Sequence, residues 1–407
     1  MNLFKLRRPA VAVVEPVPAA PAAAASLSSE WLMASAALPA PIFVRGQGSW
    51  LWDNDGRVYL DFTQGSAGNS LGHCPQVVSE ALSAQAQTLL NCGGQLTNHN
   101  QLLLAQKLCQ STGSDQAYLL NSGAEACAAA IRLARKWGQL HRSGADHVIT
   151  ASQACHGRGL DTSGFSKVAF NDLSALHAAV DSRTVAIMLE PIQGEAGVIP
   201  ASREYLQGVE RLCRELGILL IFDEVLTGIG RCGALLAEQR YDVRADIIAL
   251  GTGLGGGVPV AALLARGSAC CAEPGELQGS QHGNALMCAA GLAVLQSVLA
   301  PGFFEQIKDR GRHLREGLSR LCGRYGHGEV RGQGLLWALQ LHDEVAPALV
   351  QAALQEGLLL QAPQPDVVRF APALTISRGL VDEMLLKLAR AFARLHGQQH
   401  NRREMRA

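Results

Sequence analysis

Short apolar runs that alternate with amphipathic segments are the feature of this sequence that most restricts its fold. Six runs are long enough for buried strands, at residues 117–120, 148–150, 185–189, 218–222, 247–250 and 258–264. Apolar residues at helical spacing fill several of the gaps, at 126–137, 172–180 and 202–216. Strands that are apolar throughout have both faces buried, which is typical of parallel sheets covered by helices on both sides. The sequence therefore predicts an α/β fold with a mostly parallel sheet.

The segments on either side of this region predict a smaller α+β unit. Residues 49–53 and 57–62 have the pattern of a hairpin with Asp55-Gly56 in its turn. After residue 300 we expect a helix at 302–322, short strands at 335–339 and 367–370, and a C-terminal helix at 380–395. We divide the chain into a disordered Ala/Pro-rich leader (1–28), the first part of a small domain (29–75), a large domain (76–299), the second part of the small domain (300–398) and a flexible tail (399–407).

The charge balance and the cysteines exclude several classes of function. Thirty-five Lys and Arg residues balance thirty-five Asp and Glu residues, so no net positive field would attract a nucleic acid or a membrane surface. No apolar run is long enough for a membrane-spanning helix. Glu15 and Pro16 interrupt the apolar stretch near the N-terminus, which argues against a signal peptide. The eleven cysteines include no CxxC pair, which favours reduced thiols in the cytoplasm and no metal site.

The run Asn121-Ser-Gly-Ala-Glu-Ala126 lies directly between a predicted strand and an Ala-rich predicted helix. Ser122 and Glu125 have the spacing of a capping box, which would only begin the helix. Alternatively, the glycine in the first turn lets backbone N–H groups approach a phosphate at the positive end of the helix. Local chemistry leaves both interpretations open.

A second apolar run ends in two acidic residues, Asp223 and Glu224. The magnesium-binding strand of a nucleotide triphosphatase would have this form, but it needs a GxxxxGK[ST] loop, which the sequence lacks. The acids can also be solvated charges at a strand end. A third interpretation places a carboxylate at the carboxyl edge of a parallel sheet, where open α/β folds bind ligands. There it could pair with a protonated ring nitrogen.

Residues 251–256 read Gly-Thr-Gly-Leu-Gly-Gly and satisfy the GxGxxG pattern of dinucleotide-binding proteins. Such a site needs a helix directly after the glycines and an acidic residue about twenty positions further on. Glu273 meets the second condition, but Pro259 and the β-like run after it argue against the helix. A dinucleotide enzyme is therefore the least favoured interpretation.

Three further segments carry polar residues next to predicted strands. Glu190 and Glu195 lie in the turn after the run 185–189, and His156 precedes Gly157 and Arg158 after the run 148–150. Alone, these indicate only loops at the edge of the sheet. Arg369 lies within the apolar run 367–370, and a buried arginine must find an anion from the protein or from a ligand.

In this order, the segments resemble the class III, acetylornithine/ornithine-type aminotransferases, which are fold-type I pyridoxal-phosphate enzymes. The resemblance covers residues 42–393, and its specific runs are NSGAEA, HGR, LEPIQGEAGV, IFDEV with TGIGRCG, ADIIALGTGLGGGVPVAALLA, RGQGLLWAL and VVRFAPAL. It implies a seven-stranded, mostly parallel sheet in a large cofactor-binding domain. It also implies a smaller α+β domain built from both chain ends, and a dimer whose sites lie at the interface.

The resemblance implies a set of contacts to pyridoxal 5'-phosphate. In the family, the residues at the positions of Gly123 and Ala124 hold the phosphate, and that at Asp223 binds the ring nitrogen and keeps it protonated, so that the ring accepts electrons. Val225 would pack against one face of the ring. The residues that the resemblance assigns to the cofactor are Ser122, Gly123, Ala124, Cys155, His156, Asp223, Val225, Leu226 and Gln281.

The resemblance also implies how a substrate is held. Arg158 and Arg369 would bind substrate carboxylates, Arg369 through a bidentate contact. Glu195 would lie at the substrate entrance and change partners between donor and acceptor. Ser280 and Gln281 fall in the segment that, in the family, reaches the phosphate of the neighbouring subunit, although this stretch is one residue short here.

Three positions depart from the family pattern. Thr252 occupies the position of the Schiff-base lysine, which in the family bonds covalently to the cofactor aldehyde. A hydroxyl cannot form that bond, and it is too weak a base to move the substrate proton at neutral pH. Cys155 stands where the family has an aromatic residue stacked on the ring, and Leu226 stands where it has a glutamine. The lysines of the chain lie outside the segments expected at the cofactor, at positions 5, 107, 136, 167, 308 and 387, which leaves His282 as a candidate base.

Two hypotheses for the function follow. In the first, the chain is an acetylornithine-type aminotransferase that transfers an amino group from N-acetylornithine or a related diamino acid to 2-oxoglutarate, slowed by the loss of the lysine. Pyridoxal phosphate would then be bound without a covalent link or be lost. In the second, it is a catalytically silent paralogue that serves as a binding or regulatory partner. The expected partners are a small amino or keto acid and a second subunit, either a copy of this chain or an intact paralogue, with no nucleic acid and no membrane.

Overall fold

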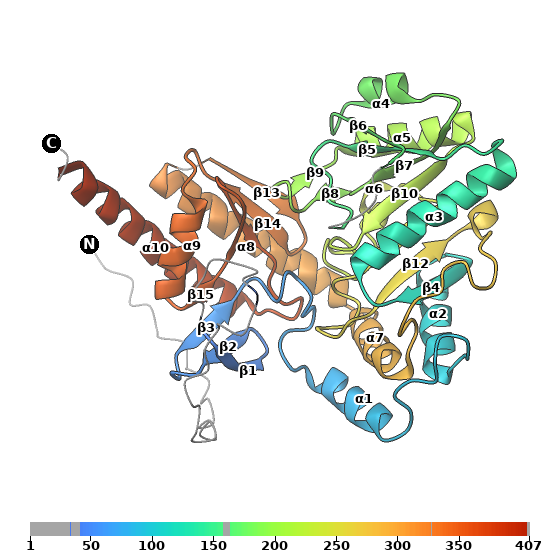
Figure 1. Ribbon diagram of the computed structural model, residues 1–407. Helices are drawn as coiled ribbons and strands as arrows, with labels where there is room; N and C mark the ends of the chain where they lie inside the picture. The colour runs from blue at the N-terminus through green and yellow to red at the C-terminus, as the bar shows by residue number, and fades with distance from the viewer. Residues whose placement is uncertain (1–32, 34–40, 158–162, 327, 405–407) are drawn as a thin grey trace.

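The protein consists of two lobes joined side by side (Figure 1). The computed structural model describes residue 33 and residues 41–157, 163–326 and 328–404. The predicted leader (1–28) and Arg158 lie outside the described residues. One lobe contains the middle of the chain, and the other combines segments near both ends (Figure 1).

A seven-stranded sheet forms the centre of the large lobe, in the order β4-β12-β11-β10-β7-β5-β6. Its strands are β4 (Gln116–Leu120), β5 (His147–Ala151), β6 (Phe165–Val168), β7 (Thr184–Leu189), β10 (Leu219–Glu224), β11 (Ile247–Leu250) and β12 (Ala261–Ala265). The pairs from β6 to β11 are parallel, whereas β12 is antiparallel to both of its neighbours. The prediction of a mostly parallel, seven-stranded sheet is confirmed.

Helices cover both faces of this sheet, which is why its central strands are apolar throughout. One core cluster joins α3 (Gly123–His141) to alternate residues of the strands, and a second joins the other face to α2 (His99–Thr112), α5 (Arg203–Leu216) and α7 (Ala285–Val298). The remaining elements of this lobe are α1 (Gln76–Ala86), α4 (Leu173–Ala179), α6 (Glu238–Tyr241), the 3₁₀ turn η2 (Gly267–Ala269), and the two-stranded ribbon of β8 (Ile192–Gln193) and β9 (Ile199–Pro200).

The small lobe contains two four-stranded sheets built from both ends of the chain. The N-terminal strands β1 (Phe43–Gln47), β2 (Trp50–Asp53) and β3 (Val58–Asp61) are completed by β15 (Leu358–Leu359), which pairs parallel to β3. The second sheet has the order β13-β14-β17-β16, with β13 (Glu329–Gln333), β14 (Leu336–Gln340), β16 (Gln361–Gln364) and β17 (Val367–Phe370). The predicted hairpin is confirmed as β2 and β3, and the Asp53 carboxylate accepts two backbone N–H groups inside its turn.

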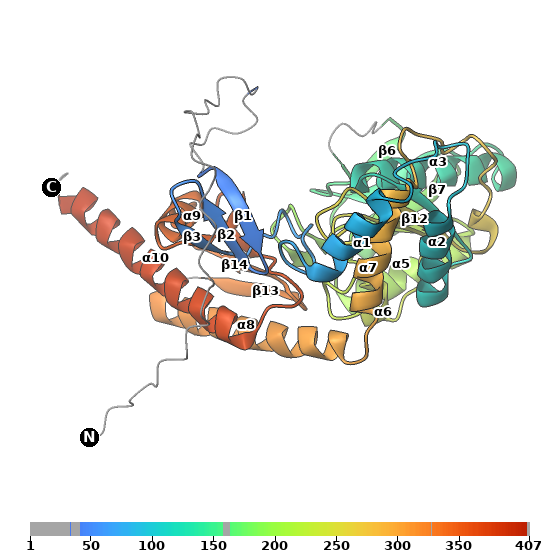
Figure 2. The same ribbon diagram turned by 90° about the horizontal axis from the view of Figure 1, so that it is seen from below.

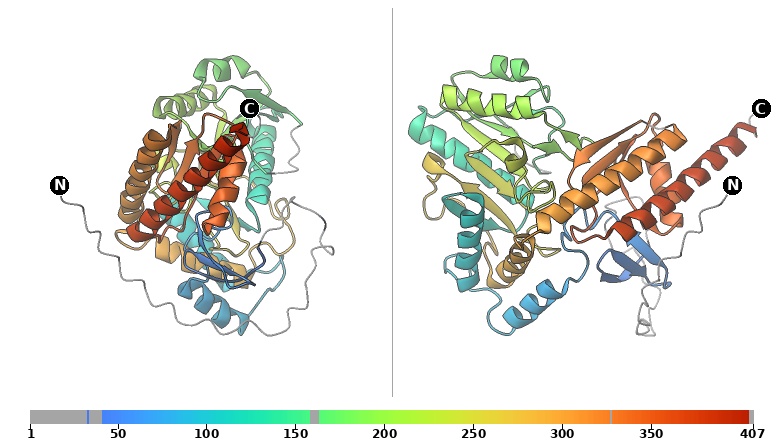
Figure 3. Two further views of the ribbon diagram at one scale, coloured as in Figure 1. Left: turned by 90° about the vertical axis from the view of Figure 1, so that its left-hand side faces the viewer. Right: turned by 180° about the vertical axis from the view of Figure 1, so that it is seen from behind.

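Three helices support these sheets: α8 (Phe303–Tyr325), α9 (Ala346–Gln355) and α10 (Arg378–Glu404). Figure 2 shows α8 extending from the large lobe along the small lobe, and α10 lies beside it (Figure 3). Tyr325 of α8 stacks on Phe392 of α10 at a ring separation of 5.0 Å. The backbone of α10 continues to Glu404, so the predicted flexible tail begins inside a helix. Residues 398–404 are polar but contain neither proline nor glycine, and such residues can prolong a helix beyond its packed face.

The glycine-rich run after β11 does not begin a helix. Residues 252–257 form turns that lead into the antiparallel strand β12. The helix that a dinucleotide site needs is therefore absent at this place, and that interpretation of the glycines is wrong. Among the described residues, no single helix is long and apolar enough to cross a membrane, although α7 and α8, bent by 74°, pass that test as a pair.

Candidate active site

A cavity of about 820 Å³ lies where the carboxyl ends of the large-lobe strands face the small lobe. Residues that follow β5, β7, β10 and β11, together with the first turn of α3, form one side of it, and β16 and β17 form the other. The carboxyl edge of a parallel sheet is the usual ligand site of open α/β folds. We call its side formed by Cys155, Asp223, Val225, Leu226 and Thr252 the sheet wall, and its side formed by Glu195, Gln361 and Arg369 the arginine wall.

Asp223 is the centre of a buried hydrogen-bond network on the sheet wall. Its Oδ2 atom lies 2.8 Å from His156 Nδ1 and accepts the Cys127 thiol at 3.2 Å, and its Oδ1 accepts the Val225 N–H at 3.0 Å. The other ring nitrogen of His156 contacts Thr150 Oγ1 at 2.7 Å, which fixes the orientation of the imidazole. The carboxylate is thus held rigidly, with only 5% of its residue surface exposed.

Burial and the neighbouring charge shift the pKa of His156 in opposite directions. Burial alone would lower the pKa of its imidazole, but the hydrogen bond and the negative charge of Asp223 outweigh it and raise the pKa above its usual value. The side chains of Cys127, His156 and Asp223 also offer three metal-ligand atoms within 4.8 Å of one another. Because these atoms already contact each other at hydrogen-bond distances, we interpret the group as a hydrogen-bond network.

Glu190 is a second buried acid at this cavity, and the sequence analysis assigned it no role. It directly follows β7, and its two carboxylate oxygens accept the backbone N–H groups of Cys155 at 3.0 Å and Gly194 at 3.3 Å. Burial, and then the nearby charge of Asp223, raise the pKa of Glu190 to about 7. An acid directly after a fully apolar run was the only signal in the sequence that could have identified it.

The first turn of α3 lies at one end of the cavity. Ser122 is the N-cap, and its hydroxyl accepts the Glu125 N–H at 3.3 Å, while the Glu125 carboxylate accepts the Asn121 N–H at 2.9 Å. Gly123 and Ala124 line the cavity, so backbone groups at the positive end of the helix border it. A Cβ atom at Gly123 would lie 2.3 Å from Val225 Cγ1, so the glycine is needed for this close approach.

On the arginine wall, Arg369 uses both sides of its guanidinium group. Its Nη1 atom donates to Glu195 Oε1 at 2.7 Å and to the carbonyl oxygen of Gly194 at 3.3 Å. Its Nη2 and Nε atoms both donate to Gln361 Oε1, at 2.8 and 3.2 Å. The Arg369 side chain is 4% exposed, whereas that of Glu195 is 51% exposed. Gln361 was not identified from the sequence.

The three residues at which the resemblance predicts a departure from the family pattern all lie on the sheet wall. Thr252 lines the cavity two residues after β11, Leu226 lines it two residues after β10, and Cys155, which also lines it, is exposed. None of the five described lysines lines the cavity. The residues present can therefore accept a ring N–H at Asp223 and a phosphate at α3, but they offer no amine for a covalent link.

The segment around residue 281 lies elsewhere. The carbonyl oxygen of Ser280 accepts Asn121 Nδ2 at 2.8 Å, and Gln281 Oε1 accepts Asn91 Nδ2 at 2.8 Å. His282 contacts the Tyr118 hydroxyl and a Glu125 carboxylate oxygen, each at 3.3 Å. None of the three is among the described residues that line the cavity, so His282 does not replace the missing base within this subunit.

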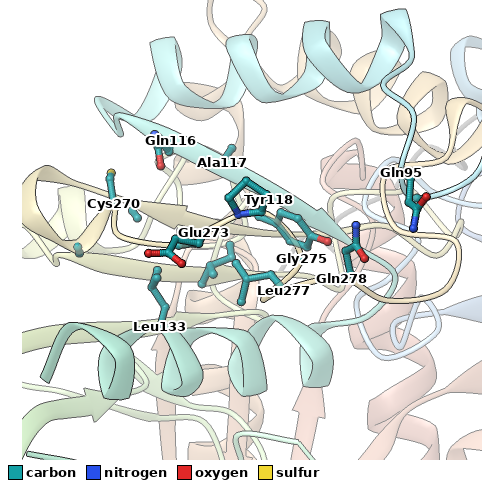
Figure 4. Close-up of a pocket in the computed structure, with 16 residues that line it drawn as sticks. Gln95, Gln116, Ala117, Tyr118, Leu133, Cys270, Glu273, Gly275, Leu277 and Gln278 are labelled. Atoms are coloured by element: carbon teal, nitrogen blue, oxygen red, sulfur yellow. The ribbon is translucent and has the colours of Figure 1, made fainter. Parts of the chain in front are cut away.

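A second cavity, of about 390 Å³, lies at the edge of the large sheet. Figure 4 shows its labelled residues gathered between β4, which carries Gln116 and Tyr118, and α3, which carries Leu133, with the loop containing Glu273 closing one side. Exposed leucines lie in the neighbouring part of the chain, at positions 89, 90, 96, 102 and 103. This edge of the large lobe therefore presents apolar surface.

Comparisons with known proteins agree on one family. The sequence profile described as Aminotransferase class-III matches residues 33–168 and 163–392. Acetylornithine aminotransferase 2 of Bordetella parapertussis is 47% identical over 377 residues, covering 88% of this chain and 95% of that protein. Acetylornithine aminotransferase of Ralstonia nicotianae is 42% identical over 383 residues, covering 88% and 96%.

Solved structures give the same result. The crystal structure of N-acetylornithine aminotransferase from Stenotrophomonas maltophilia K279a has a TM-score of 0.82 and 34% identity, and the match covers 89% of this chain and 98% of that chain. The ornithine aminotransferase of Toxoplasma gondii ME49 has a TM-score of 0.86 and 29% identity, covering 90% and 94%.

Proposed function

The chain belongs to the class III aminotransferases, and on this premise we propose that it is an acetylornithine-type aminotransferase with impaired turnover. Its reaction would move an amino group from N-acetylornithine or a related diamino acid to 2-oxoglutarate. The observation that supports this is the placement of Asp223 and Arg369 on opposite walls of one cavity. The relatives named above are acetylornithine aminotransferases, and this chain matches each of them over nearly its whole length.

The residues of the cavity fit pyridoxal phosphate held without a covalent link. When bound, this cofactor supplies an aldehyde that condenses with amines and a ring that accepts electrons. Asp223 would accept the ring N–H, and the first turn of α3 at Gly123 and Ala124 would hold the phosphate. Val225 would pack beneath the ring. Arg369 would bind the carboxylate of the amino or keto acid when Glu195 moves away from it.

Thr252 limits what this site can do. Its hydroxyl cannot form the imine that a lysine forms with the cofactor, and at neutral pH it cannot accept the proton that leaves the substrate carbon. A positioned general base typically contributes about 10²–10⁴ in rate. We therefore expect retained binding of the cofactor and of carboxylic acids, with slow turnover.

A catalytically silent paralogue is the second candidate, and one observation favours it. The three substitutions at Cys155, Leu226 and Thr252 lie together on the sheet wall, where the reaction would occur. In that case the chain would act as a binding or regulatory partner subunit. The subunit beside it would be an intact paralogue, and interface residues of this chain would serve the site of that neighbour.

The apolar edge of the large lobe supports assembly with a second subunit, either a copy of this chain or that paralogue. The exposed leucines at 89–103 and the cavity in Figure 4 would be covered in such an assembly. Ser280 and Gln281 lie near this edge and would face the cofactor phosphate of the neighbour. We place the protein in the cytoplasm, which the eleven unpaired cysteines within the described ranges support.

Replacing Thr252 by lysine tests the proposal. Thr252→Lys should turn the purified protein yellow in a way that survives dialysis, and it should raise the rate with N-acetylornithine and 2-oxoglutarate by at least about 10²-fold. Thr252→Ser is the matched control and should do neither. If borohydride attaches the cofactor to a lysine of the unsubstituted protein, that result would contradict the assignment of Thr252. If the lysine variant remains inactive, the result would favour the second candidate, a binding or regulatory partner subunit.

A further inference from the structure

We propose that Gln361 is an internal ligand of Arg369 that competes with the substrate carboxylate and thereby sets the affinity of the site for carboxylic acids. This inference rests on the proposed role of Arg369 as the carboxylate-binding residue. Gln361 Oε1 accepts two N–H groups, from Nη2 at 2.8 Å and from Nε at 3.2 Å. It thus occupies the side of the guanidinium group formed by Nε and Nη2, which offers two parallel donors.

The geometry of that side suits a carboxylate. The Nε and Nη2 donors of arginine point in the same direction and match the two oxygens of a carboxylate, one bond to each. In this structure a single neutral amide oxygen receives both bonds. An incoming carboxylate would replace this shared neutral acceptor with two charged ones, so it can displace Gln361. It must nevertheless displace it before binding.

The other side of Arg369 offers no free alternative. Its Nη1 atom already donates to the Glu195 carboxylate and to the carbonyl oxygen of Gly194. The guanidinium group is buried, and a buried cation without acceptors is costly. Glu195 and Gln361 together therefore complete the hydrogen bonding of Arg369 while no ligand is bound, and each must move for a substrate to bind in its place.

The strand register explains why Gln361 is in this position. Gln361 of β16 is the direct antiparallel partner of Arg369 of β17, and cross-strand partners have adjacent side chains. The amide nitrogen of Gln361 donates to Ser66 Oγ at 2.8 Å, which directs the amide oxygen towards the guanidinium. Gln361 is half-buried and Ser66 is exposed, and both line the cavity, so the released amide can be solvated by water.

A second glutamine of β16 holds the other component of the arginine wall. Gln364 Nε2 donates to the backbone carbonyl oxygen of Glu195 at 2.8 Å. The strand register shifts between Gln361 and Gln364, which lets both side chains reach the same wall although they are three residues apart. The strand β16 of the small lobe thus anchors the loop of Glu195 through Gln364, while Gln361 occupies the arginine.

Binding of glutarate tests the inference without requiring turnover, because this dicarboxylic acid has neither an amino nor a keto group. Isothermal titration of the full-length protein gives the dissociation constant. Gln361→Ala removes the competitor and should tighten binding by about three- to tenfold, since one hydrogen-bond acceptor of a charged group is lost from the free state. Gln361→Glu places a charged competitor on Arg369 and should weaken binding by at least about tenfold.

The opposite signs separate competition from a structural role. If Gln361 only supported the fold, both substitutions would weaken binding, and weaker binding by Gln361→Ala would overturn the inference. Gln355→Ala, at an exposed position near the end of α9 in the same lobe, is the matched control and should bind glutarate as the unsubstituted protein does.

Arg369→Gln separates this inference from the proposed function. Unchanged glutarate binding by Arg369→Gln would contradict the carboxylate-binding role of Arg369 and with it the proposed function. Weaker binding by Arg369→Gln combined with unchanged binding by both Gln361 variants would overturn the competition alone. If Gln361→Glu does not fold, the tightening expected of Gln361→Ala decides the question.

Discussion

The two walls of the cavity differ in function: the residues of one are suited to binding, and those of the other lack a group for bond formation. The arginine wall contains a cation with acceptors on both sides, so in the proposed function it would bind a carboxylic acid by exchanging one acceptor for another. The sheet wall has a rigid carboxylate at Asp223, but it has a hydroxyl at Thr252, where the proposed reaction would need an amine. Binding and bond formation therefore depend on different residues, and one substitution can remove the second while the first is retained.

The largest effect that tests this comparison is expected at Asp223. Asp223→Asn removes the charge that would pair with the protonated ring and leaves His156 without its anionic partner. Breaking a buried ion pair costs about 3–5 kcal/mol, so the affinity for pyridoxal phosphate should fall by roughly two to four orders of magnitude. Equilibrium dialysis against the cofactor, read by absorbance, measures this.

A substitution on the arginine wall provides the contrast. Glu195→Gln removes a half-exposed charge that pairs with Arg369 on the same wall, away from Asp223, and should change the cofactor affinity by less than about twofold. If Asp223→Asn binds the cofactor as tightly as Glu195→Gln does, the ring nitrogen of the cofactor does not pair with Asp223.

A pH-dependent stability is the next effect, and it arises at Glu190, which accepts the backbone N–H of Cys155 on the sheet wall. Because burial raises the pKa of Glu190 from 4.5 to about 7, the folded protein binds this proton more tightly than the unfolded chain does. The resulting stabilisation is present at low pH and is lost as the pH rises from about 4.5 to 7, by on the order of 3 kcal/mol. The raised pKa of His156 has the same sign, since its stabilisation is lost above its ordinary titration range.

Urea denaturation between pH 5 and 8 tests this prediction. The difference in unfolding free energy between the unsubstituted protein and Glu190→Gln should change with pH, favouring the unsubstituted protein most at the acidic end. Gln355→Ala removes no titratable group, so its difference should stay constant. A constant difference for Glu190→Gln as well would show that this carboxyl group ionises as it does in the unfolded chain.

The fold could be predicted from the sequence because its central strands are uniformly apolar. The run 185–189 and the strand β7 (Thr184–Leu189) agree within one residue, and every residue of that strand is buried. The strand β6 (Phe165–Val168) was missed, because it lies at the edge of the sheet and carries an exposed lysine that interrupts the apolar pattern. Uniform burial leaves a clear pattern in a sequence, and partial burial does not.

The site could be predicted only in part, for a related reason. The position of Asp223 follows from the end of an apolar strand, which can be located in the sequence. Its partners His156 and Cys127 lie 67 and 96 residues away, and no local pattern links them. The contact of Gln361 with Arg369 depends on the register of β16 against β17, which contains an irregularity that the sequence does not specify.

The smallest effect compares two glycines that pack against the sheet wall: Gly123 lies against Val225, and Gly194, next to Glu195 of the arginine wall, lies against Leu226. A methyl group added at Gly123 would lie 2.3 and 2.9 Å from the two γ-carbons of Val225, whose β-branched side chain has little rotational freedom. Gly123→Ala should therefore destabilise the protein by about 1–3 kcal/mol. At Gly194, the added methyl would lie 2.1 Å from one terminal carbon of Leu226 but 3.5 Å from the next atom.

Because a leucine can rotate its terminal carbon away, Gly194→Ala should cost less than about 1 kcal/mol. Gly323→Ala is the control: it lies within α8, its methyl would meet no described atom within 4 Å, and it should stabilise the protein by about 0.5–1 kcal/mol. Chemical denaturation of the three variants ranks them. Equal losses at Gly123 and Gly194 would mean that Leu226 is held as rigidly as Val225 and cannot move away from the added methyl group.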